Sequence, residues 1–179
     1  MTTPSGSGAS RPVVWNGRHV WLRRLRIDDE KRYAAFHAAL DPARFDRRME
    51  KGIPDPDAFV RTLECDDRDI LIAAVVNDVG GGSVLGVARA TRIADQNSAE
   101  IAIVLQPNVE GHGLGRLLMG SLVNYCRDCG LSELVGQVSR DNRRMIDLAH
   151  AFRFVDASGA VPDAVWLRLE LGRSARAEE

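Results

Sequence analysis

Ile101-Ala-Ile-Val-Leu-Gln-Pro-Asn-Val-Glu-Gly-His-Gly-Leu-Gly-Arg-Leu-Leu-Met119 carries the clearest structural pattern in this chain of 179 residues. Its first part is apolar and β-branched and stops at a proline, which predicts a strand, because proline cannot donate a hydrogen bond to a sheet. Its last part spaces apolar residues three or four apart from Leu114 onward, which predicts an amphipathic helix. The glycines in between, Gly111, Gly113 and Gly115, let a ligand approach the backbone, and N–H groups at a helix start attract phosphate. The pattern predicts an anion-binding turn, with a plain glycine connection as the alternative.

Two well-known nucleotide motifs do not fit these glycines. A dinucleotide fingerprint needs a third glycine at the position of Arg116. A P-loop needs lysine and then serine or threonine after Gly115, where this chain has Arg116 and Leu117. The glycines therefore form neither of these two motifs.

Around this segment the sequence alternates short apolar strands with amphipathic helices, without an internal repeat or a second core. A first strand is expected at 13–25, followed by a helix that Asp28 or Asp29 caps and that runs to Leu40. The later elements are expected in this order: a charged connection at 43–51, a short helix at 55–64, strands at 69–77, 83–93 and 98–106, a helix from 114 that ends at Gly130, a strand at 134–139, a helix at 142–152 and a strand at 165–171.

This order predicts a single α/β (α+β) domain over residues 13–172, with a central mixed, mostly antiparallel sheet flanked by helices. Residues 1–12 are rich in Ser, Thr, Gly and Pro and are expected to be a disordered N-terminal tail. Residues 173–179 are expected to be a flexible C-terminal tail.

Composition and charge exclude several classes of function. The formal net charge of −1 gives no general attraction to nucleic acid or to an anionic membrane. The longest apolar run, Ile70–Val76, is too short to cross a bilayer, and the N-terminal residues lack the apolar core of a secretion signal. Three cysteines fit a reducing compartment, so we expect a cytoplasmic protein.

Cys126-Arg-Asp-Cys129 has the spacing of a redox or zinc half-site. It lies on the back of the predicted helix rather than at a helix start, where a thiolate would be stabilised. A zinc ion needs two further ligands, and the four histidines show no paired spacing. We therefore expect no metal and interpret the pair as two small thiols one helical turn apart.

The glycine loop and the order of elements together resemble the GNAT superfamily of N-acyltransferases. The family's acyl-CoA pyrophosphate loop is written Gln/Arg-x-x-Gly-x-Gly/Ala, and its marked positions fall on Glu110, Gly113 and Gly115. Glu110 departs from the usual Gln or Arg. The resemblance extends over nearly the whole domain.

A second motif lies downstream of the loop. Asn142, Met145 and Phe154 take positions of the family's Asn-x-x-Ala…Gly-Phe motif. Arg153 stands where glycine is usual, and Ala149 stands where many members have the tyrosine that protonates the CoA sulfur. Bacterial protein-lysine acetyltransferases of the Pat type look most similar and also tend to lack that tyrosine; the similar stretches are Gly86–Arg89, Ala99–Ala102, Gly113–Leu118 and Asn142–Met145.

The resemblance implies an acetyltransferase that uses acetyl-CoA as co-substrate and a primary amine as acceptor, which attacks directly in a ternary complex. Glu100 is the expected base, because it shares a strand face with Ala102 and Val104, where partial desolvation would raise its pKa toward the working range. An ordinary surface glutamate is the alternative. CoA is expected to leave as the thiolate, or with a proton from Ser139 or water.

The resemblance also implies the contacts to the co-substrate. The strand is expected to bulge open near Val104–Gln106, so that its N–H groups polarise the thioester carbonyl and pair with the pantetheine arm. The side chain of His112 either touches phosphate or faces solvent. The expected cofactor-binding residues are Val104, Leu105, Gln106, Gly111, His112, Gly113, Leu114, Gly115, Arg116 and Asn142.

The sequence leaves the acceptor open. The Pat-type resemblance favours a protein lysine, and a small-molecule amine is the alternative. The basic residues Arg44, Arg47, Arg48 and Lys51 argue mildly against a polycation. A third interpretation is a non-catalytic acyl-CoA-binding sensor or interaction module. A homodimer is among the assemblies that the sequence allows, and neither nucleic acid nor membrane is expected as a partner.

Overall fold

The computed structural model describes residues 11–40, 69–76, 82–159 and 163–172. The charged connection at 43–51, the helix at 55–64, Cys65 and the C-terminal tail lie outside the described residues. The same holds for all but two residues of the N-terminal tail. Within the described part of the chain, no helix is long and apolar enough to span a membrane.

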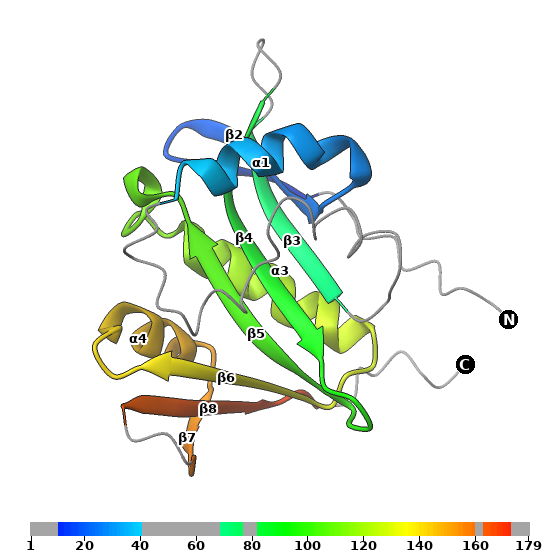
Figure 1. Ribbon diagram of the computed structural model, residues 1–179, viewed down its shortest axis with the longest axis vertical. Helices are drawn as coiled ribbons and strands as arrows, with labels where there is room; N and C mark the ends of the chain where they lie inside the picture. The colour runs from blue at the N-terminus through cyan, green and yellow to red at the C-terminus, as the bar shows by residue number, and fades with distance from the viewer. Residues whose placement is uncertain (1–10, 41–68, 77–81, 160–162, 173–179) are drawn as a thin grey trace, which may run out of the picture.

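The described residues form eight strands in one mixed sheet, in the order β1-β2-β3-β4-β5-β6-β8-β7 (Figure 1). Every neighbouring pair is antiparallel except β5 and β6, which run parallel. This confirms the predicted mixed, mostly antiparallel sheet. The strands are β1 Arg11–Trp15, β2 Arg18–Arg24, β3 Asp69–Val76, β4 Ser83–Arg92, β5 Ser98–Leu105, β6 Glu133–Ser139, β7 Val155–Ala157 and β8 Ala164–Glu170.

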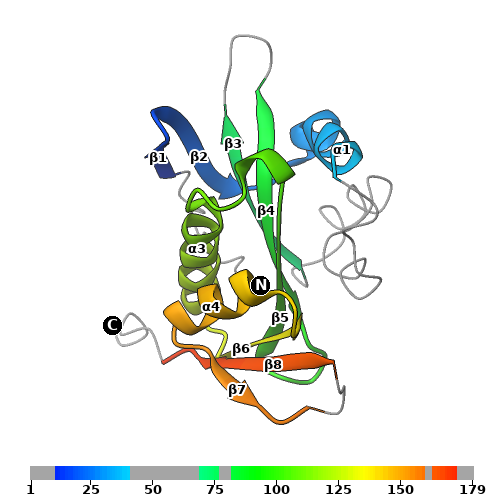
Figure 2. The ribbon, with the colours of Figure 1, turned by 90° about the vertical axis from the view of Figure 1, so that its left-hand side faces the viewer.

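The helices cover both faces of the sheet. Figure 2 shows α1 (Glu30–Ala38) on one face and α3 (Leu114–Asp128) and α4 (Arg143–Ala151) on the other. Short 3-10 turns at Ile27–Asp29 and Pro107–Val109 precede α1 and the glycine loop. The three-layer arrangement gives the sheet an α1 face and an α3 face, and both names are used below.

The first predicted strand, 13–25, is wrong, because the chain folds there into a hairpin of β1 and β2. The turn is Asn16-Gly17, with φ of +47° and +73°, which is the conformation that a two-residue hairpin requires. Asn-Gly is a recognised turn signal, and the apolar alternation on either side of it hid the reversal. β1 also begins two residues before the predicted domain boundary, since Arg11 and Pro12 pair with Leu22 and Trp21.

Two hydrophobic cores hold the layers together. On the α3 face, α3 buries a stripe that includes Leu114, Leu118 and Leu122 completely, as the three-and-four spacing predicts. On the α1 face, Tyr33 and Phe36 pack against β3 and β4. Successive residues of a strand point to opposite faces, so β3, β4 and β5 each contribute side chains to both cores.

Asp29 fixes the start of α1. Its buried carboxylate accepts two hydrogen bonds from Arg23, at 2.6 and 2.8 Å, and one from the backbone of Arg26 at 2.9 Å. Burial by itself raises the pKa of this carboxyl. The hydrogen bonds from Arg23, Arg26 and Arg32 outweigh burial, so the pKa of Asp29 lies below its ordinary value.

The strands β5 and β6 separate soon after they meet. Their register covers only Ser98 to Glu100 on β5 and Glu133 to Val135 on β6. Beyond those pairs the two strands diverge (Figure 1). β5 meanwhile continues to pair with β4 up to Leu105 without a shift in register. The bulge that we expected near Val104–Gln106 is therefore absent from this ladder, and divergence of β6 opens the sheet instead.

Candidate functional site

The glycine loop ends in an uncapped helix start. Gly111 and Gly113 have φ of +77° and +85°, and a Cβ built on either would meet nothing within 4 Å. Gly113 is the N-cap of α3, and no side chain caps the helix there. Leu114 is fully buried, so it can offer a ligand only its backbone. The N–H groups of the first turn therefore stand ready for an anion, with the 15-residue helix dipole behind them.

Trp15 anchors this loop from the opposite end of the sequence. Its indole N–H donates to the carbonyl oxygen of His112 at 2.7 Å, across a separation of 97 residues. The two rings also meet edge to face, with centroids 6.4 Å apart. The side chain of His112 is exposed and does not line the pocket described next. The loop is thus held by its backbone, and the His112 ring packs on Trp15.

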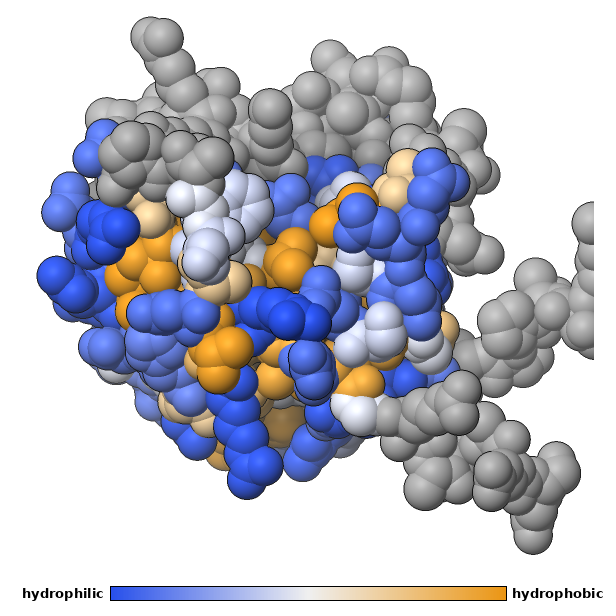
Figure 3. Space-filling model, turned by 90° about the horizontal axis from the view of Figure 1, so that it is seen from below, coloured by the Kyte–Doolittle hydropathy of each residue, from blue (hydrophilic) through white to orange (hydrophobic). Residues whose placement is uncertain are grey.

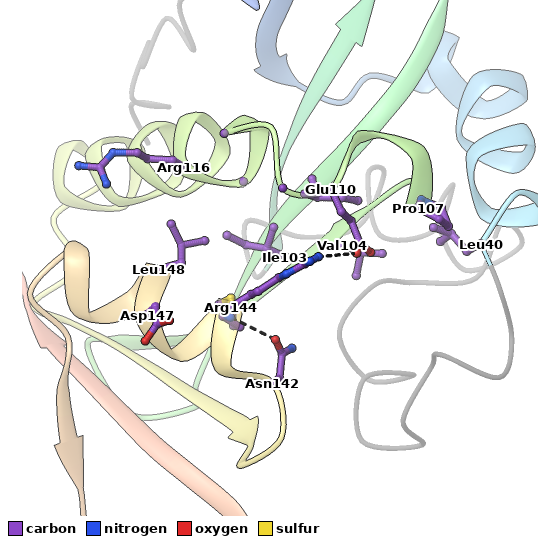
Figure 4. Close-up of a pocket in the computed structure, with 15 residues that line it drawn as sticks. Leu40, Ile103, Val104, Pro107, Glu110, Arg116, Asn142, Arg144, Asp147 and Leu148 are labelled. Carbon is purple, nitrogen blue, oxygen red and sulfur yellow. Dashed lines mark hydrogen bonds and ion pairs between the residues drawn. The ribbon is translucent and has the colours of Figure 1, made fainter. Parts of the chain in front are cut away.

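A pocket of about 650 Å³ opens beside the loop, where β5 has left β6 (Figure 4). Ile103 and Leu105 reach it from the α3 face, whereas Val104 belongs to the α1 face. The pocket therefore connects the two faces of the sheet through the gap between the strands. It is lined by Leu40, Ile103, Val104, Leu105, Pro107, Glu110, Gly111, Gly113, Gly115, Arg116, Asn142, Arg144, Met145, Asp147 and Leu148.

The backbone of β5 presents an unpaired edge to this pocket. The N–H of Gln106 donates to Leu85 on β4 at 2.9 Å, and Ser98 accepts from Ile93 on the same side. Backbone groups point to alternate edges along a strand, so those of Ile103 and Leu105 point toward the gap. Of the three positions we assigned to the thioester and pantetheine, only Leu105 has its backbone on the open edge.

Val104 and Gln106, the other two assigned positions, do not present their backbone to the gap. Val104 turns its backbone toward β4 but lines the pocket with its side chain. The side chain of Gln106 donates to the carbonyl of Val84 at 2.9 Å and does not line the pocket. Gln106 thus closes the end of β4, and its predicted contact with the co-substrate is not supported by this geometry.

Charges of both signs surround the mouth of the pocket. Arg144 on α4 lies 3.6 Å from the carboxylate of Glu110 on the loop, and both side chains are exposed enough to rearrange. The guanidinium of Arg116 lies 5.6 Å from the centre of the Phe152 ring. Asp147 also lines the pocket. The Arg144 contact balances the negative charge that Glu110 brings to the phosphate loop.

Asn142 works first as a helix cap. Its side-chain oxygen accepts from the N–H of Met145 at 3.1 Å and begins α4 (Figure 4). It also lines the pocket, as do Met145 and Leu148 from the same helix. The asparagine therefore positions α4 against the gap and leaves its amide nitrogen toward solvent or a ligand.

Glu100 sits at the point where the sheet begins to open. It pairs with Thr91 on β4 and with Val135 on β6, in the last β5–β6 pair before the strands diverge. Its face is the one predicted, shared with Ala102 and Val104. Its side chain is exposed and does not line the pocket, so the predicted partial desolvation is wrong.

Two other titratable side chains, Tyr125 and His150, make contacts within the protein away from the pocket. The hydroxyl of Tyr125 accepts from Arg24 at 3.1 Å, and burial raises its pKa. His150 is exposed and lies 2.8 Å from Asp156. Ala149, at the position of the missing tyrosine, is fully buried in the core. None of Tyr125, His150 and Ala149 lines the pocket.

The two thiols, Cys126 and Cys129, differ in burial. Cys126 is fully buried against the sheet rather than on the back of α3, and this burial raises its pKa to about 12. Cys129 is exposed at the end of the helix. Across the described ranges, no three His, Cys, Asp or Glu side chains are grouped as a metal site would need.

The sequence prediction missed one wall of the pocket. Arg144, Met145, Asp147 and Leu148 lie on one helix and were seen only as a motif around Asn142. Their three-and-four spacing places them on neighbouring positions of α4, and this could have indicated a common face. Leu40, at the end of α1, gave no comparable signal.

The site fits the predicted co-substrate. Acetyl-CoA joins a dianionic pyrophosphate to a long arm with two amides, and the pocket offers an uncapped helix start next to an unpaired strand edge. The space above Gly111 and Gly113 is open where other residues would place a Cβ. On the face seen from below, apolar and polar side chains are interspersed (Figure 3).

Comparisons with known proteins point the same way. A model described as acetyltransferase (GNAT) family matches residues 33–154. An acetyltransferase of Pseudomonas aeruginosa is 29% identical over 143 residues, which cover 78% of this chain and 77% of that protein. The crystal structure of the GNAT domain of S. lividans PAT gives a TM-score of 0.74 at 21% identity and covers 95% of this chain and 100% of that one. The structure of YncA of Salmonella typhimurium with its cofactor acetyl-CoA gives a TM-score of 0.67 at 22% identity and covers 89% of this chain and 98% of that one. The two structures share the fold of this chain.

Proposed function

This chain belongs to the acetyltransferase (GNAT) family, whose model matches residues 33–154, and we propose that it moves the acetyl group of acetyl-CoA directly to a primary amine within a ternary complex. The observation that carries this proposal is the pocket that passes through the sheet between β5 and β6. A pocket that is open to both faces of the sheet lets acetyl-CoA enter from one side and the amine from the other, so that both are bound at the same time.

The α3 side of the passage suits the co-substrate. Pyrophosphate would accept hydrogen bonds from the N–H groups at Gly113 to Gly115, and Arg144 stands at the mouth as a counter-charge. The arm would lie along β5 and pair with the backbone of Ile103 and Leu105. An N–H on that edge would stabilise the negative charge that develops on the thioester oxygen.

The α1 side of the passage suits the acceptor. Val104 and Leu40 form its wall near the gap, and Glu100 lies further along the same face of β5. An alkylamine is mostly protonated at neutral pH, with an ordinary pKa of about 10.4, and must lose a proton before it attacks. Because Glu100 is exposed, we propose that it takes this proton through water.

The transfer then balances without a metal. The amine nitrogen forms a bond to the carbonyl carbon, the carbon–sulfur bond breaks, and CoA departs with the electron pair. The nitrogen, positively charged after the attack, gives its second proton to water or to the departing thiolate. A thiol with an ordinary pKa of about 8.5 is an adequate leaving group as the thiolate, so the buried Ala149 needs no replacement acid.

A protein lysine is the acceptor that we propose first. The support is the Pat-type pattern of four stretches in the sequence, together with the fold shared with the S. lividans PAT domain. A small-molecule amine is the second candidate. A non-catalytic acyl-CoA-binding module is the third, and the exposed Glu100 is the observation that favours it.

The test combines binding with turnover. Purified protein is titrated with acetyl-CoA by calorimetry and then assayed for thiol release with lysine peptides and small amines. Glu100→Gln is expected to keep acetyl-CoA affinity and to lower kcat, most strongly at low pH, where the amine holds its proton best. Glu30→Gln, an exposed carboxylate at the start of α1, is the matched control and should leave kcat unchanged.

Each outcome decides between the candidates. Thiol release with acetylated peptide supports the lysine acceptor, and release only with free amines supports the small-molecule one. Tight binding without release from any acceptor would support the non-catalytic module. A Glu100→Gln variant with parental kcat at every pH would remove Glu100 from the mechanism.

A further inference from the structure

The register of the sheet places four polar side chains together on the α1 face. Asp69 on β3 lies directly across from Thr91 on β4, and Thr91 lies across from Glu100 on β5. Arg89 is two residues along from Thr91 and opposite Ala102. The alternation of side chains puts all four on the face that α1 covers further up the sheet.

Arg89 holds Asp69 in a two-point ion pair. Its Nε donates to one carboxylate oxygen at 2.9 Å and its Nη2 to the other at 2.8 Å. The hydroxyl of Thr91 adds a third hydrogen bond to Asp69 at 2.6 Å. Both charged side chains are largely buried, with 14% and 12% of their surface exposed. A bidentate pair of this kind is fixed in geometry and neutral overall.

The two other carboxylates at this end of the sheet, Glu133 and Glu100, differ in whether a positively charged side chain lies beside them. Glu133, two strands from Thr91, pairs with Arg168. Glu100 makes no hydrogen bond or ion pair with the part of the chain that the structure describes. Between Glu100 and the pocket, the same face of β5 carries only Ala102 and Val104. On this face, the aliphatic side chains of Ala102 and Val104 therefore lead from the pocket to the carboxylate of Glu100, which has no counter-charge among the described residues.

We propose that Arg89 determines the specificity for the acceptor: by neutralising Asp69, it makes the site select an alkylamine with one positive charge over one with two. This inference rests on the proposed function. A lysine-like acceptor would lay its aliphatic chain on Ala102 and Val104 and bring a single ammonium group to Glu100.

The distance between the two carboxylates explains why Asp69 matters. Asp69 and Glu100 are separated by two steps between strands, and each step is about 4.8 Å. An extended diamine with four carbons can span a gap of about 10 Å when the carboxylate side chains lean toward it. With Asp69 occupied by Arg89, the second ammonium group of such a diamine has no counter-charge and meets a guanidinium instead.

The experiment measures the ratio of kcat/KM for 1,4-diaminobutane to that for 1-aminobutane, which differ by one ammonium group. Arg89→Gln is expected to raise this ratio about fivefold, because Asp69 loses the positive charge of its two-point ion pair. Asp69→Asn is expected to lower it by a similar factor, because the charge of Arg89 is left unbalanced. The double variant should return to the parental ratio, since the net charge of the pair is restored.

The opposite changes of the ratio in the two single variants distinguish an effect on specificity from an effect on stability. Loss of a structural ion pair would lower the melting temperature of both single variants and leave the ratio unchanged. An unchanged ratio, or a shift of the same sign in both variants, would overturn the role of Arg89. If Arg89→Gln fails to fold, the direction of the ratio in Asp69→Asn still decides. If the parent protein acetylates neither amine nor a lysine peptide, the proposed function fails first and this inference with it.

Discussion

The substitution Gly115→Val separates the function of the glycine loop from its fold. Gly115 lies in the first turn of α3, where its φ is not positive, and a Cβ there would meet Leu105 and Leu148 at 3.6 Å. That distance is ordinary van der Waals contact, so the protein itself accepts a side chain that starts there. Since valine forms helices slightly better than glycine, by about 0.5 kcal/mol, the stability of the variant should change little.

Binding of CoA should weaken in this variant. The branched side chain would enter the space that the pyrophosphate must share with the N–H groups of the helix start. Loss of one hydrogen bond to a charged group costs about 1.5–3 kcal/mol, which corresponds to a dissociation constant about 10- to 100-fold higher. Calorimetric titration with CoA gives this constant, and thermal unfolding gives the stability.

Two alanine variants complete the comparison. Gly113 and Gly130 have φ of +85° and +76°, so alanine at either position should cost about 1–2 kcal/mol of stability. Gly130 follows the far end of α3 and should keep parental CoA binding, whereas Gly113→Ala should lose both stability and binding. A folded Gly115→Val protein that binds CoA as tightly as the parent would refute the phosphate role of the loop.

Three other perturbations test the charges and thiols of the structure. Arg144→Ala should weaken CoA binding about two- to fivefold, and Glu110→Gln in the same chain should restore it; additive losses in calorimetry would contradict the pairing. Iodoacetamide at pH 8 should label Cys129 and spare Cys126, whose pKa is raised to about 12, and peptide mass mapping of labelled native protein would reveal the opposite result. Asp29→Asn should lower the free energy of unfolding by about 3 kcal/mol at neutral pH. Because the folded pKa of Asp29 is depressed below 3.8, this difference should shrink as the pH falls through that value, and an equal difference in urea unfolding at pH 7 and pH 3 would exclude the ion pair as its cause.

The elements that local pattern specifies could be predicted from the sequence. The spacing of leucines gave α3, the helical pattern at 142–152 gave the start of α4 within one residue, and Gly130 ended α3 with φ of +76° as expected. The hairpin at Asn16-Gly17 was missed although its turn residues are typical. β7 was missed because it is three exposed residues long and carries no apolar alternation.

The site could be predicted only in part, because its remaining features depend on register and distance. The face of Glu100 follows from strand alternation, but its exposure depends on what covers that end of the sheet. The pairs Arg89–Asp69 and Arg144–Glu110 join different elements, and the contact of Trp15 with His112 spans 97 residues. No local pattern encodes which of these side chains meet.

The divergence of β5 from β6 gives the molecule more strand edges than its outline suggests. β1 and β7 are the outer strands, and the gap adds two further edges in the middle of the sheet. An exposed edge recruits extended backbone, as in the recognition of peptides by strand addition. An acyl-CoA whose amides pair there would act as a ninth, non-peptide strand, and the folded chain without it would be an incomplete sheet. Because such a ligand binds only the folded chain, the supply of acyl-CoA in the cell would also set how well the protein resists unfolding and proteolysis.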